Sequence, residues 1–185
     1  MKPSGTTSLV AGVYGPGLHF SKMVSGYRLV RVANNSELIP ILKRANYQVE
    51  SSATDPLYTS VVYFPWLPPK EIRTEEDATI WEKFKMAADM QWYWADNQVS
   101  CTVEFTSQEA ERGEISRCLE AFEGQIKGIS LLPRVDGVYK QMPFTRASRE
   151  EVEAYSAKLQ PLDFSSLLVE GENADSSKFC EACML

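Results

Sequence analysis

Apolar and polar positions follow a strand-like pattern in four stretches of the chain. Residues 26–33, GYRLVRVA, alternate between the two faces, and residues 59–66, TSVVYFPW, are rich in the β-branched and aromatic residues that strands favour. Two further strands are expected over 98–105, QVSCTVEF, and over 126–133, IKGISLLP. These four stretches are the strands that the pattern predicts.

Apolar residues at helical spacing predict helices between these strands. A short helix is expected over 36–45, where Pro40 is tolerated only near the first turn. Thr74, followed by three acidic residues, predicts the start of the next helix. The apolar face of that helix comprises Ile80, Phe84, Ala87, Ala88 and Ala95.

Two capping boxes predict the starts of the last two helices. Thr106 pairs with Glu109 in the first box, and Ser148 pairs with Glu151 in the second. The apolar stripes that follow are Ile115, Cys118, Leu119 and Phe122 in one helix, and Val152, Tyr155 and Leu159 in the other. Since strands alternate with helices, the pattern predicts an α/β fold.

The segment 165–185 differs from the rest of the chain. Its EGENADSSK stretch is polar, lacks aromatic residues and shows no apolar periodicity. We therefore expect a folded part over 1–164 and a flexible tail over 165–185.

Composition and charge narrow the class of protein. A chain of 185 residues with 44% hydrophobic residues is long enough for one domain with a real core. A net charge of −6 and an isoelectric point near 5.0 argue against binding to nucleic acid or to an anionic membrane. We see no signal peptide and no apolar run of transmembrane length, so a cytoplasmic location is expected.

The four cysteines divide into two kinds. Cys180 and Cys183 form a CxxC pair in the tail, which either exchanges with a disulfide or consists of two exposed thiols without a role. Cys101 in a strand and Cys118 on an apolar helix face are expected to be buried as small hydrophobic residues. Because the one histidine, His19, is distant in sequence, the pattern argues against a zinc site.

The chain opens on MKPSGTTSLV, a stretch suited to an anion. It offers a close backbone approach at a glycine, several hydroxyl donors and an apolar run that predicts a helix start. The candidate phosphate-binding residues are Ser4, Gly5, Thr6, Thr7 and Ser8. The alternative is a frayed terminus rich in serine and threonine, and the stretch is not a Walker A loop.

Other candidate chemistry is sparse. The aromatic residues of 90–98, MQWYWADNQ, are expected in the core, and His19 is not expected to be catalytic. The chain contains no GxSxG or HExxH motif and no histidine triad. It does not have the composition of a self-sufficient enzyme.

The opening stretch KPSGTTSLVAGVYGPGLH resembles the substrate-phosphate loop of the adenosylcobalamin-dependent (class II) ribonucleotide reductases, whose pattern is close to KPSGTLSLLAGVTPGIH. The resemblance continues in order through YRLVRVANNSELIPILKRANYQVE, IWEKFKMAADMQWYWADNQVSCTVEF, QIKGISLLP and GVYKQMPF. It is nearest to the monomeric branch that reduces ribonucleoside triphosphates. Two departures are a loop that is one residue longer and a closer spacing of the tail cysteines.

The resemblance implies a fold and a set of roles. The chain would be the C-terminal portion of a ten-stranded α/β barrel, and its phosphate loop would hold the ribonucleotide substrate. Cys180 and Cys183 would carry reducing equivalents from thioredoxin to the active site. Adenosylcobalamin would be held by the assembled enzyme. The radical cysteine would come from an N-terminal reductase piece, so the isolated chain is expected to be inactive.

Two other functions remain open at the level of sequence. One is a non-enzymatic remnant that binds phosphate, and the other is a small thiol–disulfide carrier in which only the tail acts.

Overall fold

The computed structural model describes residues 7–134, 140–165 and 167. Its strands are β1 (Gly26–Ala33), β2 (Val49–Ser51), β3 (Thr59–Trp66), β4 (Thr102–Phe105), β5 (Ser130–Pro133) and β6 (Phe144–Arg146). Four of them form an antiparallel sheet in the order β2-β3-β1-β6, whereas β4 and β5 form a separate parallel pair. The proposed tail lies almost wholly outside the described residues.

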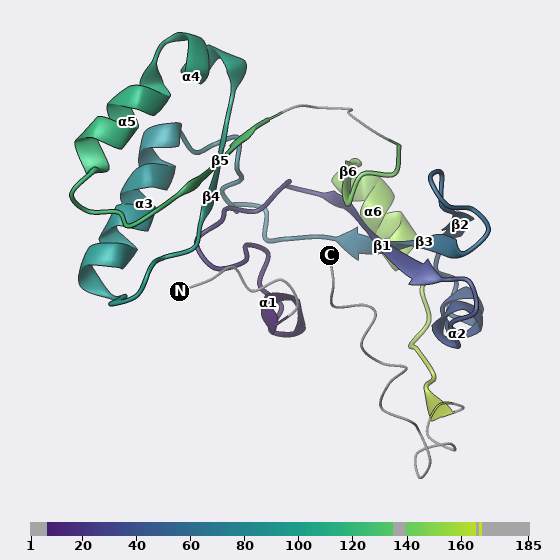
Figure 1. The fold of residues 1–185 in the computed structure, drawn as a ribbon. Coiled ribbons are helices and arrows are strands. Elements are labelled where there is room, and N and C mark those ends of the chain that lie inside the picture. The colour runs from purple at the N-terminus through teal and green to yellow at the C-terminus, as the bar shows by residue number, and fades with distance from the viewer. Residues whose placement is uncertain (1–6, 135–139, 166, 168–185) are drawn as a thin grey trace.

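All the helices except α1 group with one of the two sheets (Figure 1). They are α1 (Thr7–Val10), α2 (Leu38–Arg44), α3 (Ile80–Tyr93), α4 (Ser107–Glu111), α5 (Glu114–Phe122) and α6 (Arg149–Ser156). The parallel lobe comprises β4, β5 and α3–α5, and the antiparallel lobe comprises the larger sheet with α2 and α6. The α/β prediction is confirmed, although the larger sheet is antiparallel throughout.

Strands β1 and β3 have the bounds that the pattern predicts. They pair along their whole length, from Gly26 opposite Trp66 to Ala33 opposite Thr59. Val61 and Val62 of β3 are both fully buried, and since successive side chains of a strand point to opposite faces, both faces of the sheet are covered here. The short strands β2 and β6 were not predicted, because three residues are too few to show a period.

Helix α3 begins five residues later than predicted. Thr79 is its N-cap and forms a reciprocal capping box with Glu82. The expected cap, Thr74, instead donates from its backbone nitrogen and its hydroxyl to Asp77 Oδ2, at 2.7 and 2.8 Å. The Asp77 carboxylate therefore closes a separate turn ahead of the helix, and the prediction at Thr74 is wrong.

The two capping boxes predicted for later helices lie at helix starts. Thr106 and Glu109 form the full reciprocal box, and Ser148 accepts a hydrogen bond from the backbone nitrogen of Glu151. Gly113 has a φ of 67°, a left-handed conformation that separates α4 from α5. The single helix expected after Thr106 is therefore two helices.

The core of the parallel lobe lies between α3, α5 and β4. Its buried residues are Ile80, Phe84, Ala87, Val99, Cys101, Val103 and Cys118. The burial predicted for Cys101 and Cys118 is confirmed, at 7% and 0% exposure. Leu119, predicted on the apolar stripe of α5, is 40% exposed. It is therefore not part of this buried cluster.

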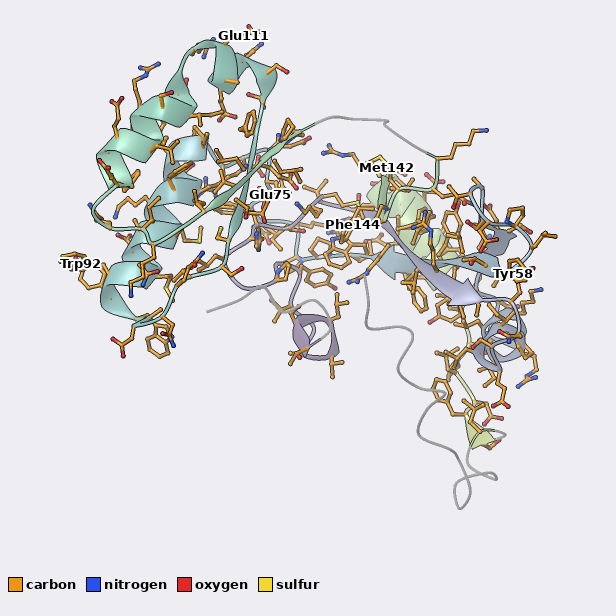
Figure 2. The ribbon with its side chains drawn as sticks, in the orientation of Figure 1. Tyr58, Glu75, Trp92, Glu111, Met142 and Phe144 are labelled. Carbon is orange, nitrogen blue, oxygen red and sulfur yellow. The ribbon has the colours of Figure 1, made fainter. Side chains whose placement is uncertain are left out.

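The aromatic residues of 90–98 are not in the core. Trp92, Tyr93 and Trp94 are 66%, 80% and 76% exposed, so the sequence expectation is wrong. The buried position at this end of α3 is taken by Gln91, whose amide donates to the carbonyls of Ala95 and Asn97. Trp92 points outward at the end of α3 (Figure 2).

No helix in the described part of the chain is long and apolar enough to cross a membrane.

Candidate functional site

Helix α1 and the residues that connect it to β1 lie between the two lobes (Figure 1). Of the five predicted phosphate-binding residues, Ser4, Gly5 and Thr6 lie outside the described residues. Thr7 is exposed at the start of α1, and Ser8 is 8% exposed. Helix α1 is a single turn, so its dipole alone does not make an anion site.

The segment that follows α1 is a compact turn. Gly15 is needed there for space, because a Cβ at this position would lie 2.3 Å from the carbonyl oxygen of His19. Gly17 has a φ of 64°, which favours glycine. The backbone nitrogen of His19 donates to the carbonyl of Pro16 at 3.2 Å and closes the turn.

The His19 ring connects this turn to the parallel lobe. Its Nδ1 lies 2.8 Å from the carbonyl oxygen of Pro16, and its Nε2 accepts from the backbone nitrogen of Thr102 at 3.2 Å. An acceptor at Nε2 and a donor at Nδ1 define the neutral tautomer with its proton on Nδ1. Both ring nitrogens are thus used by the backbone, and the ring acts as a brace between the turn and β4.

A buried ion pair is connected to this turn through Phe20, whose backbone nitrogen donates to Glu75 Oε1 at 3.2 Å. Glu75 and Lys83 have side chains 5% and 6% exposed, with Lys83 Nζ 2.9 Å from Glu75 Oε2. Lys83 Nζ also donates to the backbone carbonyls of Glu75 and Glu104, both at 3.0 Å. The sequence analysis placed Glu75 in the first turn of the helix that was expected after Thr74. One feature of the sequence could have indicated the buried pair. Lys83 follows Ile80 by three positions and so falls on the apolar face of α3, where a buried lysine needs an acidic partner.

A pocket of about 400 Å³ opens at the carboxyl ends of β4 and β5. Its wall includes Glu104, Pro133 and Arg134 from the parallel lobe. Met142 and Phe144 contribute from the side of the antiparallel sheet, where Figure 2 labels them beside β6. Ligands of open α/β sheets bind at this end of the strands.

Most charges around this pocket are paired. Lys22 forms an ion pair with Glu104, and Arg146 forms one with Glu76. The hydrogen bond from Arg146 holds the pKa of the Glu76 carboxyl below its ordinary value. Arg134 donates instead to a neutral acceptor, the backbone carbonyl of Glu75, at 2.7 Å.

The described cysteines do not have the properties of exchanging thiols. Burial raises the pKa of Cys101 to about 11 and that of Cys118 to about 11, so both are protonated at neutral pH. Cys180 and Cys183, the predicted redox pair, lie outside the described residues. Within the described ranges, no group of three histidine, cysteine or acidic side chains is placed to hold a metal ion.

Comparison with known proteins gives consistent relatives, although no protein-family profile matches the chain. Over 98% of its length the chain is 40% identical to the adenosylcobalamin-dependent ribonucleoside-triphosphate reductase of Euglena gracilis, and it covers 25% of that protein. It is 38% identical to the probable adenosylcobalamin-dependent ribonucleoside-triphosphate reductase of Dictyostelium discoideum, of which it covers 24%. The chain thus spans about a quarter of the length of these relatives.

A solved structure agrees with the sequence relatives. The chain superimposes on a B12-dependent (class II) ribonucleotide reductase with a TM-score of 0.78 and 30% identity. The match covers 86% of this chain and 22% of that one. Both the sequence and the fold therefore correspond to one segment of a larger protein.

Proposed function

We propose that this chain, a homologue of one segment of the class II ribonucleotide reductases, supplies the substrate-phosphate loop and the thiol relay of such an enzyme. The observation that carries the proposal is 40% identity over 98% of the chain, together with the matching fold. The reaction replaces the ribose 2′-hydroxyl of a ribonucleoside triphosphate with hydrogen. A thiol pair provides two electrons and two protons and becomes a disulfide, and the hydroxyl leaves as water.

The proposed phosphate-binding residues are Ser4, Gly5, Thr6, Thr7 and Ser8. Hydroxyl and backbone N–H donors suit the triphosphate oxygens, and the exposed Thr7 is open to a ligand. This group binds and orients the substrate and takes no part in the electron transfer.

The proposed relay is Cys180 with Cys183. The other two cysteines support this assignment indirectly, because burial and a raised pKa make Cys101 and Cys118 poor nucleophiles. A CxxC pair in a polar stretch of sequence would meet thioredoxin and then the active site in turn.

The rest of the reductase is the proposed partner, on an N-terminal piece that carries the radical cysteine. Parallel strands are normally covered on both faces, yet Leu131 and Leu132 of β5 are 37% and 48% exposed. Trp92, Tyr93 and Trp94 add exposed aromatic surface of the kind that is enriched at interfaces. These surfaces match a segment that is covered by the remaining three quarters of the enzyme.

Adenosylcobalamin would initiate the radical chemistry in the assembled enzyme. Two pockets of the described chain have volumes of about 360 and 400 Å³, the small end of the range for a drug-sized ligand. Neither encloses a corrin macrocycle by itself. We therefore assign no residue of this chain to the cofactor, which the assembled enzyme would hold.

The test begins with the gene for this chain and its neighbours, read for a frame that encodes the other three quarters of a reductase. Both products would be combined with adenosylcobalamin, a ribonucleoside triphosphate and reduced thioredoxin, and deoxyribonucleotide would be measured. We expect activity with both pieces and none with this chain alone. The C180S/C183S variant should lose turnover with thioredoxin.

Two results would overturn the proposal. Deoxyribonucleotide formation by this chain alone would exclude the need for a partner, and inactivity of the complete mixture would exclude the reductase role. Triphosphate binding without reduction would instead indicate a phosphate-binding remnant.

A further inference from the structure

We infer that His19 and Glu75 are positioning residues for the proposed phosphate loop, because together they fix the segment that follows it to the parallel lobe. The inference rests on the proposed function, since it concerns the same loop. Neither side chain is assigned a contact with substrate.

The first step is the continuity of the segment between α1 and the brace. The nitrogen of Ala11 donates to the carbonyl of Thr7 at 3.1 Å, and that of Val13 donates to the carbonyl of Ser8 at 2.8 Å. Gly15 then lies against the carbonyl of His19, as described above. A displacement at His19 is therefore transmitted through short, hydrogen-bonded turns to Thr7 and Ser8.

The second step is the pair of adjacent anchors at the end of this segment. His19 accepts from Thr102 at the start of β4, and the next residue, Phe20, donates from its backbone nitrogen to Glu75 Oε1 at 3.2 Å. The backbone nitrogen of Glu75 in turn donates to the carbonyl of Ser21 at 2.9 Å. Two neighbouring residues tied to two different elements fix both the position and the direction of the chain.

The third step is the rigidity of the Glu75 anchor. Its other carboxylate oxygen is held by Lys83, and the backbone carbonyl of Glu75 accepts from Lys83 at 3.0 Å and from Arg134 at 2.7 Å. Glu75 therefore has one fixed placement inside the parallel lobe. This interior, rather than contacts at the surface, therefore sets the position of Phe20 and of the segment that leads back to Thr7 and Ser8.

Without these anchors the segment keeps its contact with the antiparallel lobe. Tyr14 packs edge-to-face on Trp66 of β3, with ring centroids 5.0 Å apart. The backbone bond from Glu75 to Ser21 would remain, but it lies further along the chain than the lost anchors. Thr7 and Ser8 would then occupy their binding position for a smaller share of the time. A smaller competent fraction weakens the apparent affinity by the same factor.

The test for His19 uses two near-isosteric variants of the full chain. In H19Q the amide oxygen reaches the place of Nε2 and still accepts from Thr102, whereas in H19N the shorter side chain keeps only the bond to Pro16. The dissociation constant of inorganic tripolyphosphate would be measured by calorimetry for each. We expect H19N to bind about fivefold more weakly, the effect of one lost hydrogen bond, and H19Q to bind like the wild type.

A spectroscopic readout distinguishes this role from a loss of folding. Since the chain has one histidine, ¹⁵N labelling gives one imidazole signal pair. We expect protonated Nδ1 and unprotonated Nε2 in the wild type. Hydrogen exchange at the Phe20 amide should be slow in the wild type and in H19Q, and faster in H19N.

The test for Glu75 compares E75Q/K83M with E75A/K83M. Both double variants lack the buried charges, but only glutamine still accepts from Phe20. We expect the alanine version to bind tripolyphosphate about fivefold more weakly than the glutamine version. Should neither double variant fold, the His19 pair decides the question alone.

The outcomes separate the two proposals. If the wild-type chain does not bind tripolyphosphate, the phosphate-loop function fails, and this inference fails with it. If the wild type binds but H19N and H19Q have equal affinities, only the positioning role is overturned.

Discussion

Replacing Lys83 with methionine tests how strongly the buried ion pair contributes to folding. The change removes the cation 2.9 Å from a carboxylate that is 5% exposed, and it leaves Glu75 charged in the interior. It also removes hydrogen bonds to the carbonyls of Glu75 and Glu104, although Arg134 still donates to the first. Breaking a buried pair from one side costs about 3–5 kcal/mol, so we expect K83M to lower the free energy of unfolding by about 4 kcal/mol.

The measurement is urea unfolding of the full chain, followed by the fluorescence of its four tryptophans. The matched control is K85M on the same helix, where Lys85 pairs with Asp89 at the surface, with 65% and 43% of the side chains exposed. That change should cost less than about 0.5 kcal/mol. E75Q/K83M should recover at least about 2 kcal/mol of the loss, because no lone charge then stays buried. Equal effects of K83M and K85M would refute the reasoning.

Three further predictions concern other parts of the chain. The Cβ of G15A would meet the backbone of His19, so we expect a loss of about 1–3 kcal/mol in urea unfolding, and unchanged stability would contradict the tight turn. Cys101 and Cys118 should stay inert to Ellman's reagent at pH 8 until urea unfolds the chain, because burial raises the pKa of each to about 11; fast native labelling of either would contradict this. Burial and then the Glu50 carboxylate raise the pKa of Tyr63 to about 12, whereas an unfolded tyrosine ionises near 10. The unfolded state therefore loses its proton first, and the free energy of unfolding should fall as the pH rises from about 10 to about 12, a fall that Y63F should reduce.

The strands β1 and β3 were predictable because their signal is local. Alternation and β-branched residues mark both from end to end, and their ends coincide with turn-forming sequence. The N-caps at Thr106 and Ser148 were likewise readable, since a cap needs only four neighbouring residues, and at Thr106 the full reciprocal box is present.

Features that depend on competition or on distant partners were not predictable. Thr74 and Thr79 are both good caps, and the choice falls to Thr79 because Asp77 captures Thr74 in a turn. The exposure of Trp92 depends on what packs over the end of α3, which no local pattern contains. Sequence reasoning therefore misplaced the helix start and the aromatic residues.

The candidate site likewise has one part that the sequence indicated and one part that it did not. The hydroxyl-rich loop at Ser4–Ser8 could be proposed from residue chemistry and from the family resemblance. The bonds that hold the segment behind it join His19 to Thr102 and Phe20 to Glu75, across long sequence separations. Such pairings follow only from the assembled fold.

The pairing of β6 with β1 has a consequence for the order of folding. It places Phe144 opposite Arg28, so the start of β1 gains its second neighbour only from a segment near the other end of the described chain. Contacts of such long sequence separation form slowly, and during synthesis this edge of β1 stays open until β6 has left the ribosome. An open edge is a template for pairing with another chain. Translation pauses before β6 has left the ribosome should therefore increase aggregation of the nascent protein, whereas pauses after β6 has emerged should not.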